Sequence, residues 1–371
     1  MLPTPQLLDS AKPGKEAQQF GISLRSKVVG QDEAISEVVE IYQTFLLGMS
    51  PRTHPVGSFL FLGPTGTGKT RLAEAAAESV SGDARALLKI DCGEFQHGHE
   101  VAKLTGSPPG YLGHRETHPL LSQESLNRFH TESLKLSFVL FDEIEKANDA
   151  LWNLLLGILD KATLTLGDNR RVDFSQTMIF LTGNVGAAEM SKESTPGFGL
   201  APSVTTAKRI RDVAMQAARR RFSPEFLNRI DKIVVFQHLG EPELRTVLDL
   251  ELKALEERLA ARTRFLLSLT EAAKDYLLRE GTDAQYGARH LKRAVERSLV
   301  HPLSNLIATS QLLTGDQIRV DLDADTRRLL FYKDAEGLEL PEVQTKITKA
   351  PDAPLTQPAP TVPAFAAGFC F

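Results

Sequence analysis

The segment Gly63-Pro64-Thr65-Gly66-Thr67-Gly68-Lys69-Thr70 is the stretch of this 371-residue sequence that decides its fold. It matches the pattern G-x-x-x-x-G-K-[ST] at every fixed position. It follows FLFL at 59–62, an apolar run typical of a buried strand, and precedes RLAEAAAESV at 71–80, which is typical of a helix. A strand, a glycine-rich loop and a helix in this order predict a loop that binds the phosphates of a nucleotide through its backbone N–H groups.

The chemistry of such a loop assigns a role to each of its parts. The glycines let the backbone curl around phosphate oxygens, and the start of the helix adds the positive end of its dipole. We expect Lys69 to reach the β- and γ-phosphates of ATP, and Thr70 to hold Mg²⁺. The whole segment from Gly63 to Thr70 is therefore predicted to bind ATP.

Two further strands are expected to carry polar side chains to the same place. FVLFDE at 138–143 is a buried strand that ends in two carboxylates, and MIFLTGN at 178–184 ends in an amide. In open α/β sheets, ligands bind where the strands end. We expect Asp142 to bind Mg²⁺, Glu143 to act as the general base on the attacking water, and Asn184 to orient that water or contact the γ-phosphate.

The spacing of the apolar runs predicts an α/β fold. Helical stretches separate most of the short runs, and buried strands that alternate with helices form a parallel sheet covered on both faces. The runs stand at 59–63, 87–91, 138–143, 178–184 and 233–236. We therefore expect a large ATPase domain over residues 21–239.

A second pattern begins at residue 240. Three amphipathic stretches, near 242–259, 270 and 288–306, are followed by two short strand-like runs at 317–323 and 328–332. This predicts a small, mostly helical C-terminal domain over 240–335. Residues 1–20 are polar and contain prolines, and we expect a flexible arm there; the Pro/Ala-rich segment 336–371 is expected to be disordered.

Composition limits the class of protein. The formal net charge is -4 with 24% charged residues, so nothing calls for nucleic acid as the main partner. The two cysteines are far apart and indicate a reducing compartment. No apolar run is long enough to span a bilayer and no secretory signal is visible, so we expect a cytoplasmic protein without a membrane partner.

Three segments outside the phosphate site point to one family. They are SPPGYLGH at 107–114, FSPEFLNRID at 222–231 and YGARHLKRAVE at 286–296. In this order they resemble the Clp class of AAA+ proteins, in particular the second ATPase module of ClpB, ClpA or ClpC. The resemblance covers roughly residues 20–335, which is nearly all of the chain expected to be ordered.

The resemblance implies roles for residues around the nucleotide. The segment VVGQDEAI is similar to the family's entry segment, which implies that Val28 and Val29 lie beside the adenine. Asn184 matches the first sensor. Arg229 matches the arginine finger, which reaches the ATP of a neighbouring subunit, and Arg289 matches the second sensor, carried by the small domain.

The resemblance also implies partners. Tyr111, with Leu112, matches the pore loop whose aromatic residue grips a threaded polypeptide. Phe198-Gly199-Leu200 is similar to the tripeptide with which protease-partnered Clp unfoldases dock on a peptidase ring, although it begins with Phe; a glycine-rich surface loop is the equal alternative. The first-sensor segment reads TGN where the family usually has TSN.

The resemblance implies an ATP-dependent protein unfoldase or chaperone that forms a ring, expected to be a hexamer, and threads unfolded or misfolded proteins. The sequence contains one ATPase module and lacks the substrate-binding N-domain and coiled-coil middle domain of disaggregases, so we do not expect disaggregation by this chain alone. Two alternatives stay open. One is an AAA+ ATPase that remodels a nucleic-acid complex, and the other is a scaffold that binds ATP without hydrolysing it.

Overall fold

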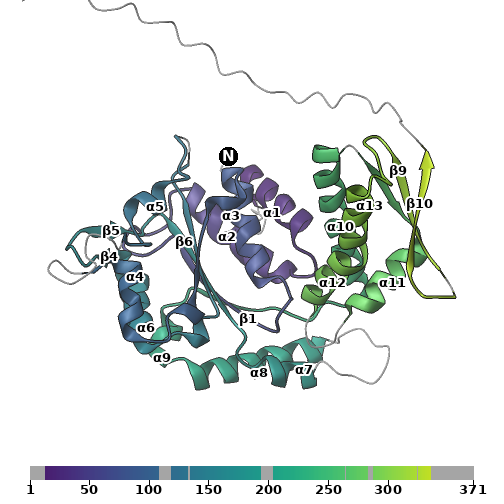
Figure 1. Cartoon of the computed structure of the whole chain (residues 1–371). Coiled ribbons are helices and arrows are strands. Elements are labelled where there is room, and N and C mark those ends of the chain that lie inside the picture. The colour runs from purple at the N-terminus through teal and green to yellow at the C-terminus, as the bar shows by residue number, and fades with distance from the viewer. Residues whose placement is uncertain are drawn as a thin grey trace, which may run out of the picture.

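The computed structural model describes residues 13–107, 118–132, 134–193, 204–263, 265–282, 287–323 and 325–335. The larger domain is built on a five-stranded sheet in the order β2-β3-β6-β1-β7, in which every neighbouring pair is parallel (Figure 1). The strands are β1 Gly57–Leu62, β2 Leu87–Asp91, β3 Ser137–Asp142, β6 Thr177–Gly183 and β7 Lys232–Val235. The α/β fold with a parallel sheet is thus confirmed, and each strand lies within about two residues of its predicted run.

The central strands are apolar along their whole length because both faces of the sheet are covered. Successive side chains of a strand point to opposite faces. Phe59 and Phe61 of β1 pack with Phe180 of β6 in one cluster, and the ring centroids of Phe59 and Phe180 are 5.2 Å apart. Leu60 and Leu62 belong to the cluster on the other face. The sheet is therefore anchored by two cores, which fixes where its carboxyl edge lies.

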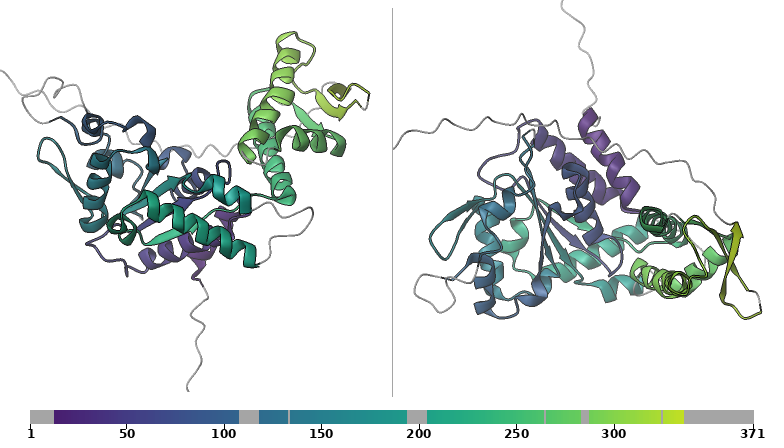
Figure 2. Two further views of the ribbon diagram at one scale, coloured as in Figure 1. Left: turned by 90° about the horizontal axis from the view of Figure 1, so that it is seen from below. Right: turned by 45° about the horizontal axis from the view of Figure 1, so that its top comes forward.

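Different helices cover the two faces (Figures 1 and 2). The Phe59 face is covered by α1 Lys15–Lys27, α2 Asp32–Leu46 and α3 Lys69–Ser81. The opposite face is covered by α6 Asp149–Lys161, the end of α8 Val204–Arg221, and α9 Pro224–Asn228. The remaining short elements of this domain are η1 Ala84–Ala86, η2 Cys92–Glu94, η3 Gly98–Val101, α4 Ala102–Thr105, α5 Gln123–Asn127, η4 Ile144–Lys146, α7 Ala187–Glu193, and the hairpin of β4 Thr163–Thr165 and β5 Arg171–Asp173.

The N-terminal arm is shorter than the sequence predicts. Helix α1 begins at Lys15, so the prediction of a flexible arm is wrong for residues 15–20. Ala17, Phe20 and Leu24 recur at helical spacing and are buried, and the Phe20 ring lies 4.4 Å from that of Tyr42. This apolar face makes α1 part of the larger domain. Residues 1–12 lie outside the described part of the chain.

The smaller domain stands beside the larger one in all three views (Figures 1 and 2). Its helices are α10 Glu241–Thr263, α11 Glu271–Gly281, α12 Ala288–Val295, the π-helical turn η5 Glu296–Val300 and α13 His301–Ala308. Its strands β8 Leu266–Leu269, β9 Gln317–Leu322 and β10 Leu329–Ala335 form a sheet in the order β10-β9-β8. Strand β8, which the sequence did not predict, pairs parallel with β9. This domain has its own core; residues 336–371 are not described.

Candidate functional site

The phosphate loop connects β1 to α3 and depends on glycine for its shape. Gly63 has φ +147°, and a Cβ atom there would lie 2.7 Å from the carbonyl oxygen of Phe236. Gly68, the residue before α3, has φ +100°. L-residues with a side chain rarely adopt these angles, so the loop needs glycine at both positions. The sequence-predicted strand, loop and helix are all present, and the loop lies at the carboxyl edge of the sheet.

Lys69 is buried in the first turn of α3. It is only 7% exposed, and its ammonium donates hydrogen bonds to Gly63 O (2.7 Å), Pro64 O (2.6 Å) and Asn184 Oδ1 (3.0 Å). Burial lowers the pKa of the Lys69 ammonium to about 8, and the neighbouring carboxylates, with Glu145 first among them, oppose this shift. The contact with Asn184 confirms that two of the predicted site residues meet.

The pair predicted to hold a metal ion also meets. Thr70 Oγ1 lies 3.4 Å from both carboxylate oxygens of Asp142. Asp142 further accepts a short hydrogen bond from Thr182, and its Oδ2 lies 3.3 Å from Lys89 Nζ. A hydroxyl and a carboxylate that converge beside a phosphate loop are oxygen donors of the kind that Mg²⁺ takes. These residues therefore fit Mg²⁺.

Glu143 follows Asp142 in a left-handed backbone conformation, with φ 58° and ψ 47°. The Thr182 hydroxyl stabilises this turn by accepting a 3.1 Å hydrogen bond from the Glu143 N–H. The Glu143 carboxylate lies 2.5 Å from Lys146 Nζ, and this carboxylate raises the pKa of Lys146. A non-glycine residue in this conformation is uncommon, and such residues cluster at functional sites.

The smaller domain reaches the phosphate loop through the start of α12. Ala288 N donates a 3.2 Å hydrogen bond to Gly66 O. Arg289, the next residue, is exposed and close enough for its charge to lower the pKa of Lys69. The structure thus brings Arg289 to the site although it lies more than two hundred residues from the loop in sequence.

Val28 and Gln31 also lie against the loop. Val28 is buried, and a Cβ at Gly68 would lie 3.8 Å from its Cγ1; Val29 is half-buried. Gln31 is 5% exposed, and its Nε2 donates to Thr67 O (3.1 Å) and Gln237 O (3.0 Å). The sequence reasoning missed Gln31, although it is part of the quoted VVGQDEAI segment.

Arg229 lies at the opposite end of the sheet from its own phosphate loop. It follows α9 as the C-terminal cap residue, and its guanidinium pairs closely with Asp160 of α6. Its carbonyl oxygen accepts a 3.3 Å hydrogen bond from Ser58 Oγ near the amino end of β1. The loop begins at Gly63, five residues further along this strand, or about 16 Å away at the usual rise per residue. Among the described residues, the structure therefore does not bring Arg229 to the phosphate site of the same chain.

Two sequence predictions fall outside the described residues. Tyr111 and Leu112 belong to segment 108–117, and Phe198-Gly199-Leu200 belongs to segment 194–203. The residues that flank the first segment are held together, because Leu120 N donates to Lys103 O and Leu121 N donates to Leu104 O, both at 3.1 Å.

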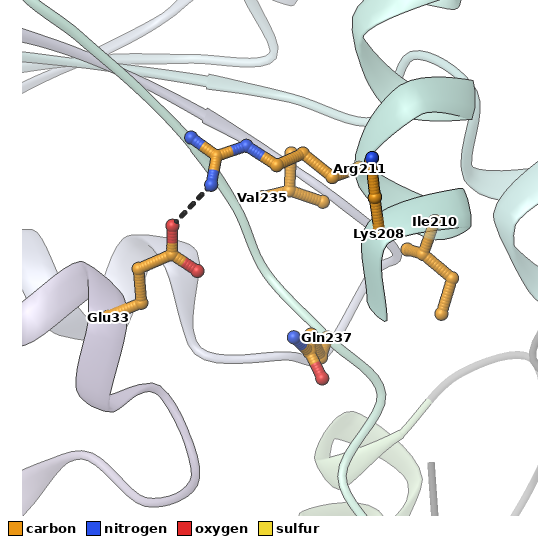
Figure 3. A pocket seen from close by; sticks show the side chains of 6 residues that line it. All are labelled: Glu33, Lys208, Ile210, Arg211, Val235 and Gln237. Atoms are coloured by element: carbon orange, nitrogen blue, oxygen red, sulfur yellow. Dashed lines mark hydrogen bonds and ion pairs between the residues drawn. The ribbon is translucent and has the colours of Figure 1, made fainter. Parts of the chain in front are cut away.

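A cavity of about 240 Å³ opens near the site, between the start of α2, α8 and the end of β7 (Figure 3). Arg211 and Glu33 form a 2.9 Å ion pair across it. Val235 pairs with Leu62, which precedes the phosphate loop, so the cavity lies at the same edge of the sheet. None of the predicted site residues that the structure describes lines this cavity. Its lining residues are Glu33, Lys208, Ile210, Arg211, Val235 and Gln237.

The comparisons agree with this geometry. Residues 54–233 match the AAA domain (Cdc48 subfamily), and residues 239–320 match the C-terminal D2-small domain of ClpB. The fold and the site thus define a nucleotide-binding module of the AAA class with its small domain. No helix among the described residues is both long and apolar enough to cross a membrane.

Similar proteins narrow the class. The chain is 39% identical over 301 residues to the ATP-dependent Clp protease ATP-binding subunit ClpC of Staphylococcus saprophyticus, an alignment that covers 81% of this chain and 36% of the relative. For the ClpC of Staphylococcus epidermidis the values are 37% over 311 residues, with 84% and 37% covered. The chain belongs to the Clp-type AAA+ ATPases, and it spans about a third of the length of these curated relatives.

A solved structure supports the same family. The closed-state reconstruction of Hsp104 with ATPyS and FITC casein matches with a TM-score of 0.73 and 30% sequence identity. The match covers 85% of this chain and 52% of the Hsp104 chain.

Proposed function

We propose that this chain hydrolyses ATP with Mg²⁺ as a subunit of a ring, a hexamer, and uses the reaction to unfold or thread polypeptides. One observation carries the proposal. The start of α12 in the small domain contacts the phosphate loop through Ala288 N and Gly66 O. Nucleotide binding at the loop, or hydrolysis there, would therefore change the angle between the two domains. Such a change of angle would convert ATP hydrolysis into movement.

Different residues at the carboxyl edge of the sheet would bind ATP, hold Mg²⁺ and activate the attacking water. Backbone N–H groups of the 63–70 loop and the Lys69 ammonium would hold the phosphates of ATP, with Val28 and Val29 beside the adenine. Thr70 and Asp142 would hold Mg²⁺, which neutralises charge on the phosphate oxygens when bound. Glu143 would take the proton of the attacking water, and the Asn184 amide would orient that water or contact the γ-phosphate.

Two arginines would complete the site from different places. Arg289 would contact the nucleotide of its own chain, because its helix already touches the loop. Arg229 would serve the ATP of a neighbouring subunit, since it lies far from the phosphate loop of its own chain. An arginine supplied by a neighbour stabilises charge on the γ-phosphoryl group and makes hydrolysis depend on assembly.

The names of the relatives support a polypeptide as substrate. The staphylococcal proteins are ATP-binding subunits of a Clp protease, and the Hsp104 structure was solved with FITC casein. We propose that Tyr111 and Leu112 grip an unfolded or misfolded protein in the pore of the ring, and that Phe198-Gly199-Leu200 docks on a peptidase ring. The proposed compartment is the cytoplasm, and nucleic acid is not a proposed partner.

The test is ATP turnover against protein concentration, with and without an unfolded model protein, and with Glu143→Gln as the inactive control. Turnover per subunit that rises with concentration, increases with the unfolded protein and disappears in Glu143→Gln is the expected result. Turnover that ignores both concentration and unfolded protein would contradict the threading function, and salt-sensitive stimulation by DNA would favour a nucleic-acid complex instead.

A further inference from the structure

The carboxylate of Glu145 stands at the active site without a role in the proposal above. Glu145 lies in the short helix η4, two residues beyond Glu143. Its Oε1 accepts a 3.0 Å hydrogen bond from the backbone N–H of Asn184. Asn184 in turn accepts a hydrogen bond from Lys69 through its side-chain oxygen. The three residues thus form a chain that runs from η4 to the phosphate-binding lysine.

The second carboxylate oxygen of Glu145 is available to accept a hydrogen bond. Glu145 Oε2 is buried and has no hydrogen-bond partner among the residues that the structure describes. A Cβ placed on Gly183 would lie 3.4 Å from this oxygen, so it lies against the backbone just before Asn184. An unpaired buried carboxylate oxygen is costly, and it is a ready acceptor for a water molecule or another donor at the site.

The backbone around Glu145 is held by residues of α6 and α8. Arg221, the last residue of α8, donates from Nε to Glu145 O at 3.0 Å. The Arg221 guanidinium lies over the Trp152 ring at 4.5 Å, and Trp152 Nε1 donates to Ile144 O at 3.1 Å. These contacts fix η4 on α6 and α8, so the Glu145 carboxylate has a rigid support of the kind that a positioning residue needs.

We propose that Glu145 is a positioning residue of the ATPase reaction, which holds the Asn184 peptide so that the Asn184 amide and Lys69 meet at the γ-phosphate. This inference rests on the proposed hydrolysis. The charge of Glu145 agrees with a position near Lys69, because this carboxylate opposes the lowering of the Lys69 pKa more than any other charged group does. Loss of the carboxylate would leave Asn184 free to shift, and small displacements at a reacting centre cost large factors in rate.

The first test compares Glu145→Ala with Glu145→Gln in the full chain. Glu145→Ala should lower kcat about 10- to 100-fold, while the ADP dissociation constant changes less than about threefold. Glu145→Gln should keep most of the rate, since its side-chain oxygen can still accept from Asn184 N. Hydrogen exchange of the Asn184 amide should become faster in Glu145→Ala and stay slow in Glu145→Gln. Glu257→Ala on the exposed face of α10 is the matched control and should change none of these values.

A double-mutant cycle separates positioning from general damage. If Glu145 acts through Asn184, Glu145→Ala should cost little in an Asn184→Ala background. The inference would be overturned if the rate losses of the two single variants multiplied in the double variant. It would also be overturned if Glu145→Ala turned over ATP at the wild-type rate. A wild-type chain that does not turn over ATP would overturn the proposed function and this inference with it. A normal wild-type rate with an unaffected Glu145→Ala variant would overturn this inference alone.

Discussion

The backbone N–H of Ala288 donates a 3.2 Å hydrogen bond to the carbonyl oxygen of Gly66, so the small domain is bonded directly to the phosphate loop. The residue before Ala288 makes this approach possible. Gly287 has φ 51° and ψ -142°, and a Cβ there would lie 3.0 Å from Gly66 O. A glycine is needed here both for the backbone angle and for the space.

We therefore expect Gly287→Ala to weaken the coupling of the two domains. The added methyl group must push α12 away from the loop, which would displace Arg289. ATP turnover should fall about tenfold, and the free energy of unfolding should fall by about 1 kcal/mol because of the strained backbone. Steady-state ATPase assays and thermal unfolding of the same preparation measure both effects.

Gly157→Ala is the control for this prediction. Gly157 lies on the exposed side of α6, and no atom of the described residues lies within 4 Å of a Cβ placed there. Alanine in a helix interior is more stable than glycine by about 0.5–1 kcal/mol, so this variant should be more stable and equally active. If Gly287→Ala kept the wild-type rate, the contact between α12 and the loop would have no part in turnover.

The buried Lys69 predicts a pH dependence of nucleotide binding. Burial lowers the pKa of its ammonium to about 8, and phosphates need the charged form. The affinity for ADP should therefore fall as pH rises through 8, by up to about tenfold per unit above it. Calorimetric titration between pH 7 and 10 measures this. Lys69→Met should bind weakly with little change over the same range, and a wild-type affinity constant from pH 7 to 10 would contradict the prediction.

The same group affects stability in the opposite direction. Without nucleotide, the unfolded chain carries Lys69 with the ordinary pKa of 10.5 and binds more protons than the folded chain between pH 8 and 10.5. The contribution of Lys69 to the free energy of unfolding should thus be least favourable below pH 8 and should rise through this window. In Lys69→Met this rise should be absent.

Much of the site was predictable because its signals are local. The phosphate loop, Asp142, Glu143 and Asn184 each directly end or follow a buried apolar run, and a parallel sheet brings such ends to one edge. The structure confirms that Lys69 meets Asn184 and that Thr70 meets Asp142. Both contacts could be predicted from the order of strands and loops alone.

The residues that were missed act through contacts distant in sequence. Gln31 bonds carbonyl oxygens 36 and 206 residues away, and Glu145 bonds an amide 39 residues away. A polar residue in a helical segment gives no local sign of such a partner. Strand β8 was missed because LLSL at 266–269 is short and acquires its strand form by pairing with β9. The prediction of a flexible arm was wrong for residues 15–20 because the three prolines and the glycine of that segment precede Lys15, whereas the buried face follows it.

Gln31 yields a prediction about stability and binding together. Its side chain is buried and links the phosphate loop to the segment after β7. Gln31→Ala removes the amide that donates hydrogen bonds to Thr67 O and Gln237 O. This loss should lower the free energy of unfolding by about 1–3 kcal/mol and weaken ADP binding. Urea unfolding and ADP titration measure the two effects. Gln18→Ala on the exposed side of α1 should change neither the free energy of unfolding nor the ADP affinity. If Gln31→Ala gave the same values as Gln18→Ala, the Gln31 side chain would not stabilise the loop.

Arg229 is best tested by mixing two inactive variants. Arg229→Ala should bind ADP normally, since this side chain pairs with Asp160 away from its own phosphate loop, but it should not hydrolyse ATP. Glu143→Gln should be inactive because it lacks the base, yet it still carries Arg229. If the arginine works on a neighbour, a mixed ring contains sites with an intact Glu143 from one subunit and an intact Arg229 from the next.

Mixing equal amounts of the two variants should therefore restore ATP turnover. Random assembly gives about a quarter of the sites both groups, so the recovered rate should approach that fraction of the wild-type rate. Arg229→Ala mixed with Arg229→Ala,Glu143→Gln is the matched control and should stay inactive, because no site there can receive an arginine. If the first mixture also stays inactive although the subunits exchange, Arg229 does not act across the interface, and its ion pair with Asp160 would be its whole role.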